Sequence, residues 1–524
     1  MTARSAGQVR IKAPRADGAV LIDPPLQQAD RLLQANRAGL AEQSEWTGLR
    51  ARGREQMLAL ATGYTSSYLD LPEQLPRGDR PVILAGHQPH FFHPGVWFKN
   101  FVLSQAAHQC DAVAVNLVID NDTAAPPSIR TPTGDLHDPR LAVVSYDSGA
   151  EAIPYEERGV LDREQFRSFA DRLRQTAAPW LQAPLALEMW PDAIEAAERT
   201  GNLGAAAAHS RHRWEHRWGL RTLEVPLSQL CQSEAFLTFA WKLLSQPASF
   251  AETYNAELAA YRTAHRLRSR SHPVPDLVTE DGWQESPFWI WSADRPRRER
   301  LFVKATSAGV ELTDRDLWQV HAESPAMLGE HLADVGIKLR PRALVTTMFA
   351  RLVLSDLFLH GIGGAKYDEL TDAIIDRFFG FQAPQYLTVS ATCLLPVQRP
   401  DVSPADLRAV DRRLRDLTFH PETHALAAHP SNPTVAQLTS QKAAAVAREP
   451  APEELAKRHQ QIVQANAGLQ PFVASQRQAA EEQRATVQHD LRVNRLLGSR
   501  EFSYLLFPEQ TLRPFLTAAG GRIS

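Results

Sequence analysis

An apolar run, a polar turn and a second apolar segment follow one another between residues 82 and 122. The sequence "VILAG" at 82–86 is short and uninterrupted, as in a strand that is buried on both faces of a sheet. Residues 96–110 place apolar side chains three and four positions apart, which predicts a helix with one wide apolar face. The run "AVAVNLVI" at 112–119 predicts a second strand. Together these elements predict a βαβ unit.

The rest of residues 1–400 alternates between helical and extended patterns. Residues 26–69 and 150–265 are predicted to be mainly helical, the second range as inserts in the core. Two apolar runs joined by a charged turn at 285–312 predict a β-hairpin. Residues 343–396 predict a helix or strand, a glycine-rich turn, an amphipathic helix and a further strand. These patterns predict the α/β fold class.

The pattern changes near residue 400, and residues 401–498 are predicted to form a helical hairpin. Apolar residues there alternate by three and four or repeat every seven, which is typical of a coiled coil. They are Leu407, Val410, Leu414 and Leu417 in the first segment and Leu455, Ile462 and Leu469 in the second. A linker with Pro421, Pro430 and Pro433 is expected between two antiparallel helices, and Pro471 is expected to kink or split the second. The hairpin would project from the core or close a dimer.

Composition and charge exclude several classes of protein. The chain has 524 residues and a net charge of −3, so no global basic field favours nucleic acid. No segment reaches the roughly 18 uninterrupted apolar residues of a membrane span, and the N-terminus lacks the apolar region of a signal peptide. Three cysteines far apart argue against a disulfide framework. We therefore expect a cytoplasmic protein that acts on small molecules.

A turn with three histidines, "GHQPHFFHPG" at 86–95, follows the first predicted strand. The next helix begins near Val96, so its free N–H groups face this turn and can bind phosphate. His87 and His90 would then orient or protonate a phosphate or leaving group. Alternatively, both could bind a metal with His93, or satisfy buried carbonyl groups. The other candidate ligand-binding residues of this turn and helix are Gly86, Gln88, His93, Gly95 and Lys99.

Asp120 and Asp122 close the second predicted strand. Because the carboxyl ends of parallel strands form the ligand edge of a sheet, these carboxylates could recognise a substrate hydroxyl or amine. They could equally cap the next turn.

The sequence "HGIGGAKYD" predicts a glycine-rich turn before a helix. Such a turn can hold phosphate, although no G-K-[ST] follows as in a P-loop, and a tight structural turn is the alternative. The candidate ligand-binding residues here are His360, Gly361, Gly363, Gly364 and Lys366.

The sequence "HSRHRWEHRW" at 209–218 is dense in charge. His212 and His216 lie one helical turn apart, but the H-E-x-x-H order of a zinc site is absent. We interpret this segment as a solvated or anion-facing basic helix.

Four stretches of the sequence resemble the bacillithiol biosynthesis family of cysteine-adding enzymes (BshC). Residues 82–107 resemble the family's glycine- and proline-containing turn and its lysine-bearing helix, and residues 115–122 resemble its acidic strand end. Residues 340–368 resemble the segment with an Ile-Gly-Gly turn, and residues 493–507 resemble the C-terminal close. The matching residues are Gly86, Gln88, Pro89, Gly95, Lys99, Asp120, Asp122, Ile362, Gly363, Gly364, Arg500 and Glu501.

The resemblance implies a Rossmann-like, nucleotidyltransferase-type core with helical insertions over residues 1–400. It also implies an antiparallel coiled coil over 401–498 that supports a homodimer, and a tail at 499–524 that returns to the core. The implied activity is ligation of cysteine to an amino-sugar conjugate, with a nucleotide site that would take ATP or ADP. The chain departs from the family pattern at His87, His90, His93 and His360, which indicates a different substrate or chemistry.

Three functional hypotheses follow. The first is a BshC-like ligase or transferase that joins cysteine, or a similar amine or thiol, to a small acceptor. In it, Lys99 and the helix end hold negative charge, and Asp120 or Asp122 recognises the substrate. The second is a metal-dependent hydrolase or transferase that uses His87, His90 and His93. The third is a non-catalytic nucleotide-binding scaffold that acts through its coiled coil.

Overall fold

The computed structural model describes residues 12–71, 80–135, 137–149, 151–269, 274–449 and 451–518. The protein is mixed α/β, with a parallel sheet and a long C-terminal helix. It divides into two compact units. The first contains residues 1–133, 142–396 and 500–524, and the second contains residues 134–141 and 397–499.

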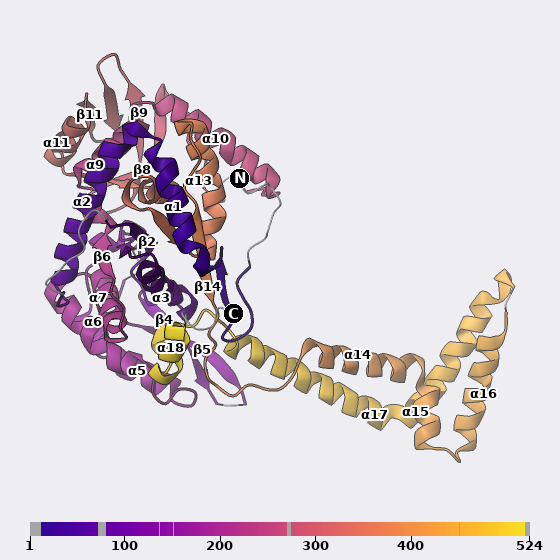
Figure 1. The fold of residues 1–524 in the computed structure, drawn as a ribbon. Helices are drawn as coiled ribbons and strands as arrows, with labels where there is room; N and C mark the ends of the chain where they lie inside the picture. Colours follow the sequence, from indigo (N-terminus) through magenta and orange to yellow (C-terminus); the bar gives the residue numbers. More distant parts are fainter. Residues whose placement is uncertain are drawn as a thin grey trace. The chain divides into compact units, whose positions relative to one another are not determined.

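A six-stranded sheet forms the centre of the first unit (Figure 1). Its strands are β1 (Val20–Asp23), β2 (Val82–His87), β3 (Val113–Val118), β6 (Leu223–Pro226), β13 (Leu357–His360) and β14 (Tyr386–Ala391). Every neighbouring pair is parallel except β1 and β14, which are antiparallel. The strands predicted at 82–86, at 112–119 and near residue 390 are confirmed.

The order of the strands across the sheet is β1-β14-β13-β2-β3-β6. The chain therefore starts its parallel strands in the middle, at β2, and builds outward through β3 to β6. It then crosses back to place β13 and β14 on the other side of β2. In open α/β sheets, ligands bind outside the carboxyl ends of the strands at such a reversal. The expected ligand edge of this sheet thus lies where β2 and β13 end.

The helices of the first unit confirm much of the predicted pattern. They are α1 (Ala29–Ala41), α2 (Ser44–Ser66), α3 (Pro94–Gln109), α4 (Arg163–Arg167), α5 (Phe169–Ala177), α6 (Ala186–Thr200), α7 (Leu203–Arg217), α8 (Leu227–Leu230), α9 (Glu234–Leu244), α10 (Pro247–Ala264), α11 (Pro325–Asp334), α12 (Ala343–Phe349), α13 (Ile362–Phe379) and α18 (Glu509–Thr517). The βαβ unit is formed by β2, α3 and β3.

Two local predictions about these elements are wrong. Residues 150–265 are not helical throughout, because they contain the sheet strand β6. That strand has only four residues and carries Glu224 at its centre, so it has no apolar periodicity that could reveal it. Helix α3 does not have one apolar face either. It is buried on almost every side, and Lys99 and Asn100 are buried among its aromatic residues.

Both faces of the central sheet are covered. Val82 and Leu84 of β2 belong to a large apolar core that includes residues of α2, α9, α12 and α13. Because side chains alternate along a strand, the residues between them face the other way. Asn116 of β3 and Glu224 of β6 lie on that second face, where α3 packs on the sheet and Arg211 of α7 contacts Glu224.

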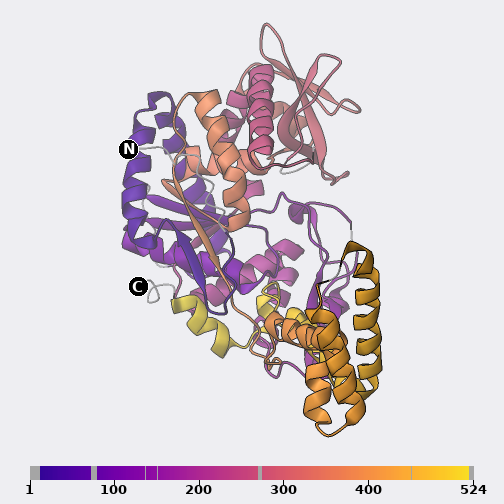
Figure 2. The ribbon, with the colours of Figure 1, turned by 90° about the vertical axis from the view of Figure 1, so that its right-hand side faces the viewer.

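A second, antiparallel sheet packs on the same apolar core (Figure 2). Its strands are β7 (Thr279–Glu280), β8 (Trp283–Ser292), β9 (Glu299–Ala305), β10 (Val310–Thr313), β11 (Gln319–Ala322) and β12 (Ile337–Pro341). The predicted β-hairpin is confirmed as β8 and β9. The pairing of these two strands shifts between Glu285 and Trp289, where Pro287 cannot donate a ladder hydrogen bond.

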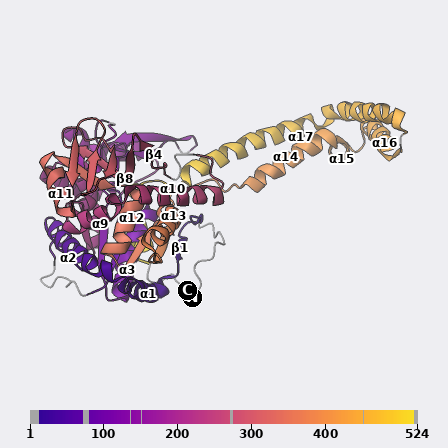
Figure 3. The same cartoon turned by 90° about the horizontal axis from the view of Figure 1, so that it is seen from above.

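The second unit is helical (Figure 3). Its helices are α14 (Pro404–Phe419), α15 (Pro421–Ala428), α16 (Pro433–Ala447) and α17 (Leu455–Leu497), and the first three pack on α17. The predicted linker with Pro421 and Pro433 is wrong, because these prolines begin α15 and α16. Proline suits the first position of a helix, where its missing N–H would have no partner.

Pro471 does not split the last long helix, since α17 continues through it. The core of the second unit also departs from the predicted heptad. Leu469 is fully buried, but Leu455 is 53% exposed, and Val473 and Ala480 are buried instead.

Two further segments complete the described chain. β4 (Ser128–Gly134) and β5 (Pro139–Ser145) pair with each other, and the sequence patterns do not reveal them. The C-terminal segment packs on the first unit through α18, which contacts α3, and through Tyr504, whose ring centroid lies 4.3 Å from that of Trp97. Within the described part of the chain, no helix has the length and apolarity that a membrane crossing needs.

Candidate functional site

A cavity of about 650 Å³ lies in the first unit where β2 and β13 end. Many of the predicted site residues line it: Gly86, His87, Gln88, His93, Gly95, Lys99, Asp122, His360, Gly361, Gly363 and Gly364. Three predicted residues, His90, Asp120 and Lys366, lie outside its lining. The site is therefore built mainly from two segments, 86–99 and 360–364, that are distant in the sequence and adjacent in the sheet.

Two helices begin at the cavity. His93 is the N-cap of α3, and its Nδ1 accepts a hydrogen bond from Gly95 N at 3.1 Å. Gly361 is the N-cap of α13, so the predicted glycine-rich turn is in fact the first turn of a helix. The first N–H groups of a helix have no partner within it and carry partial positive charge. Both helix ends therefore favour an anion in the cavity.

Two glycines are required by close packing at these helix ends. A Cβ atom on Gly95 would lie 2.1 Å from the carbonyl oxygen of Ala391 in β14. A Cβ atom on Gly364 would lie 2.7 Å from Nδ1 of His360. By contrast, a Cβ atom on Gly363 would meet no atom within 4 Å. The glycines of this helix end thus differ in role, which their spacing in the sequence does not reveal.

Three arginines from separate elements line the cavity: Arg298 before β9, Arg342 before α12 and Arg500 near the C-terminus. Sequence patterns missed Arg298 and Arg342, because nothing in their local sequence indicates that they reach the ends of β2 and β13. Arg500 was noted only through the BshC resemblance. These side chains add positive charge to that of the helix ends.

Two of these arginines keep unused donors. Arg342 donates from Nη2 to Glu285 at 2.6 Å and from Nε to the Phe288 carbonyl at 3.3 Å, and its guanidinium lies 3.9 Å from the Trp289 ring centroid. Nη1 of Arg342 is buried and has no hydrogen-bond acceptor among the described residues. Nη1 of Arg500 is likewise buried and has no hydrogen-bond acceptor among the described residues. A buried donor without an acceptor costs free energy, so both atoms are available to donate a hydrogen bond to a ligand or a water molecule in the cavity.

Asp122 is held in place by three donors. Gln88 Nε2 donates to it at 2.9 Å, Arg298 Nη1 at 2.8 Å and Thr123 N at 2.8 Å. The carboxylate thereby ties the β8–β9 hairpin to the end of β3. Asp122 lines the cavity at the end of β3, where the sequence predicts it, but its carboxylate oxygens already accept three hydrogen bonds from the protein.

Asp120 is buried away from the cavity lining. It accepts hydrogen bonds from both the backbone N–H and the hydroxyl of Ser228. Burial, with a further contribution from the neighbouring Glu156, raises the pKa of this carboxyl to about 7. Asp120 thus supports the strand end through Ser228 of α8, 108 residues away, rather than by capping the next turn.

The three histidines of the turn do not converge on one point. The rings of His87 and His90 are 5.3 Å apart and both contact Phe92, while His93 caps α3 through Nδ1. The described residues contain no group of three or more His, Cys, Asp or Glu side chains that could hold a metal ion. The metal alternative thus has no geometric support.

Burial keeps these imidazoles neutral near pH 7. It lowers the pKa of His90 to about 4 and that of His93 to about 4, in His93 against the attraction of Glu501. Burial also lowers the pKa of His87 well below its usual value, and Lys99 adds to this effect. A neutral imidazole can orient a ligand by one donated and one accepted hydrogen bond.

His360 and Asp368 form a buried pair at the end of β13. His360 Nε2 lies 2.5 Å from Asp368 Oδ2, and the same carboxylate accepts from Arg351 at 2.7 Å and Thr347 at 2.8 Å. Burial alone would raise the pKa of Asp368, but His360 and Arg351 hold it well below its usual range. The carboxylate therefore fixes the orientation of an imidazole that lines the cavity.

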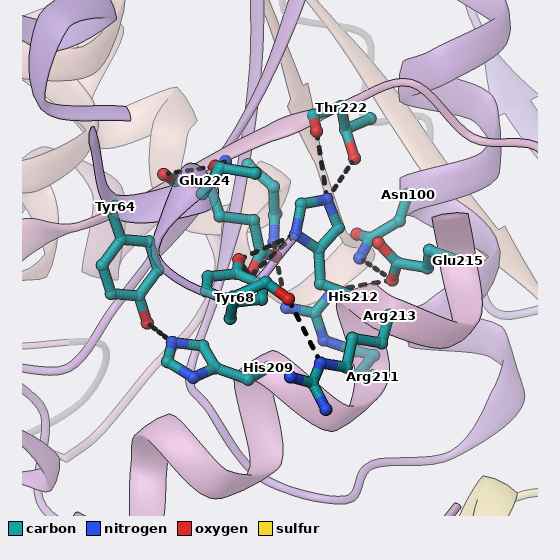
Figure 4. A network of polar contacts seen from close by, with 12 residues as sticks. Tyr64, Tyr68, Asn100, His209, Arg211, His212, Arg213, Glu215, Thr222 and Glu224 are labelled. Atoms are coloured by element: carbon teal, nitrogen blue, oxygen red, sulfur yellow. Dashed lines mark hydrogen bonds and ion pairs between the residues drawn. The ribbon is translucent and has the colours of Figure 1, made fainter. Parts of the chain in front are cut away.

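The charged helix α7 is buried, which contradicts the prediction of a solvated basic helix (Figure 4). Arg211 contacts Glu215 at 2.6 Å and Glu224 at 2.5 Å. His212 lies 2.8 Å from the Tyr68 hydroxyl and bonds Thr222 through its other nitrogen. Because Arg211, His212 and Glu215 each have a partner from another element, this part of the segment lies in the interior, whereas the Arg217 side chain is 52% exposed.

Glu215 of this network also contacts α3. It accepts hydrogen bonds from Trp97 Nε1 at 2.7 Å and Asn100 Nδ2 at 2.7 Å. The network thus fixes the helix whose first turn forms one side of the cavity.

No protein-family model matches this chain, and no curated protein matches it significantly. The chemistry of the cavity is therefore inferred from its residues.

Proposed function

We propose that the chain is an enzyme that binds an anionic small molecule in the cavity and joins a small amine or thiol to it. The observation that carries this proposal is the convergence of two helix N-termini and three arginines on one cavity of about 650 Å³. That volume is within the usual range for small-molecule sites. The two helix N-termini and the N–H donors of the three arginines, whose charges are partly balanced by Asp122, Glu285 and Glu501, favour a phosphate or carboxylate group.

The strand order supports a Rossmann-like core of the nucleotidyltransferase type, since the cavity lies at the reversal where such sheets bind nucleotides. ATP or ADP is accordingly the first ligand to test. In the BshC-like form of the proposal, cysteine is the nucleophile and an amino-sugar conjugate is the acceptor. His87 and His360, both neutral and both in the lining, would orient the anionic acceptor or its leaving group.

The second unit is proposed to have a structural role, separate from the chemistry of the cavity. Val410 and Leu417 of α14 are seven residues apart and both buried, which supports an antiparallel coiled coil formed by α14 and α17. We propose that this coiled coil supports a homodimer and that the enzyme acts in the cytoplasm.

The proposal is tested by thermal unfolding of the full-length protein with ATP, ADP, pyrophosphate or phosphate. A ligand at about 100 times its Kd should stabilise the protein by about 2.7 kcal/mol. Arg500→Gln removes a cavity guanidinium and should weaken binding by about tenfold or more. Arg31→Gln, on the exposed face of α1, is the matched control and should leave binding unchanged.

Absence of stabilisation by any of these anions would contradict the proposal. Binding with equal affinity in both variants would place the anion elsewhere. Binding without turnover of any amine or thiol would favour the non-catalytic scaffold.

A further inference from the structure

Lys99 is a buried lysine whose side chain reaches the cavity. It lies in α3, is 3% exposed and lines the cavity beside Gly86 and His87. Its Nζ donates a hydrogen bond to the carbonyl oxygen of Gly86, at the end of β2. Among the described residues, no carboxylate forms an ion pair with it. This contact differs from the predicted role, in which Lys99 holds the negative charge of a ligand.

The ionisable groups around Lys99 disfavour its charged form. Arg211 from α7 is the cation that lowers its pKa, while the neighbouring His87 from β2 and His360 from β13 are neutral and supply no opposite charge. Glu215 and Glu224 lie behind Arg211, but they are bound to Arg211 and to amide groups. On the side of β14, Arg500 adds a further cation, which pairs with Glu501.

The electrostatic consequence is a large shift in protonation. Burial, with a smaller effect of Arg211, lowers the pKa of Lys99 from 10.5 to about 7. A substantial fraction of the amine is thus unprotonated near neutral pH. Gly86 O accepts one N–H of the amine, which leaves the nitrogen lone pair available.

We propose that Lys99 is the catalytic proton acceptor of the cavity. In the joining reaction, the N–H or S–H bond of the incoming amine or thiol breaks, and its proton forms a new bond to Nζ. Lys99 becomes an ammonium group, and the electron pair left on the nucleophile forms a bond to the acceptor. The bond between the acceptor and its anionic leaving group, such as a phosphate, breaks at the same time, and that group departs with the electron pair. This step rests on the proposed function, but the state of Lys99 can be measured without turnover.

The test is acetylation of the full-length protein by a trace of acetic anhydride, a small neutral reagent that modifies unprotonated amines. Peptide mass spectrometry would follow Lys99 and the exposed Lys304 on the same sample between pH 6 and pH 11. Modification of Lys99 should be half-maximal near pH 7, about three pH units below the ordinary value for lysine. Half-maximal modification near pH 10 would show a permanently charged, structural lysine and would overturn the proposal. Absence of modification at every pH would show that the cavity does not present the amine, and would overturn it as well.

A pair of variants separates proton transfer from structure. Lys99→Arg keeps a cation that cannot release its proton, and Lys99→Met removes the amine. If Lys99 is the proton acceptor, both should lose turnover at least about a hundredfold while still binding anions with near wild-type affinity. Turnover retained in Lys99→Arg would overturn the proposal.

The stability of Lys99→Met gives a second measurement that needs no substrate. Because the folded protein binds fewer protons at this site than the unfolded chain, wild-type stability should rise with pH between about 7 and 10. The melting temperature of Lys99→Met relative to wild type should therefore fall over the same range. A difference that does not vary with pH would overturn the proposal. Failure of anion binding, by contrast, would reject the proposed function and leave the measured state of Lys99 intact.

Discussion

The charged cluster around Arg211 and the charged residues of the cavity both contain ion pairs, but they differ in whether, among the described residues, the arginine keeps a free N–H donor. Arg211 is 4% exposed and lies between two buried carboxylates, which are themselves hydrogen-bonded to Asn100 and Asn116. In the cavity, Arg342 and Arg500 keep buried nitrogen atoms without a hydrogen-bond acceptor among the described residues. An arginine enclosed by two carboxylates stabilises the fold, whereas an arginine with a free N–H donor at a cavity can also bind a ligand.

The strongest test of this comparison is removal of one matched charge. Glu224→Ala leaves Arg211 with one carboxylate in the interior, so the free energy of unfolding should fall by about 3–5 kcal/mol. Urea unfolding at pH 7 measures the change. Glu195→Ala breaks a pair with Arg213 in which the Glu195 side chain is 57% exposed, and should cost no more than about 1 kcal/mol. Similar losses in the two variants would contradict the distinction between matched burial and surface pairing.

Gly363 and Gly364, at the start of α13, test how closely the helix end packs beside the cavity. Gly364→Ala places a Cβ atom 2.7 Å from His360 Nδ1, so it should lower the free energy of unfolding by about 1–3 kcal/mol and weaken anion binding. Gly363→Ala meets open space and should stabilise the helix by up to about 1 kcal/mol. Equal effects of the two substitutions would show that the His360 ring can move aside without a loss of stability or of anion binding. Denaturant unfolding and anion titration of both variants decide this.

A smaller effect is expected at Asp120, which lies beside the cavity but outside its lining. Its folded pKa of about 7 is above the unfolded value, so the folded state binds more protons between about pH 4 and 7. Wild-type stability should therefore fall as pH rises through this range, and Asp120→Asn should remove most of that pH dependence. The measurement is the free energy of unfolding of both proteins at pH 4.5, 6 and 7.5. Parallel pH profiles would show that Asp120 ionises freely in the folded state.

Local patterns predicted the elements whose side chains follow one periodicity. β2, β3 and β14 are apolar runs, and the helices of residues 26–69 have regular apolar spacing. β6 was missed because four residues with a central glutamate have no such period. The prolines at 421 and 433 were misinterpreted because proline both ends one helix and begins another.

The candidate site was predicted only in part, for a related reason. The 86–99 and 360–364 segments carry dense clusters of His, Gly and Lys, which local sequence can reveal. Arg298 and Arg342 are ordinary charged residues until the fold brings them beside Trp289 at the cavity. The charges of α7 were predicted to face solvent or an anion, because the local sequence does not show that Glu224 of β6 and Asn100 of α3 pack against Arg211 and Glu215.

By itself, the sequence determined the βαβ unit at residues 82–118 and the location of the histidine turn at its ligand edge. It did so because burial on both faces and helical spacing act over short distances along the chain. Only the tertiary structure decided which charges are paired in the interior and which line the cavity. Asn116 and Glu224, for example, lie 108 residues apart and form one hydrogen bond of 2.6 Å. Whether a buried charge is satisfied depends on such distant partners, and local periodicity contains no information about them.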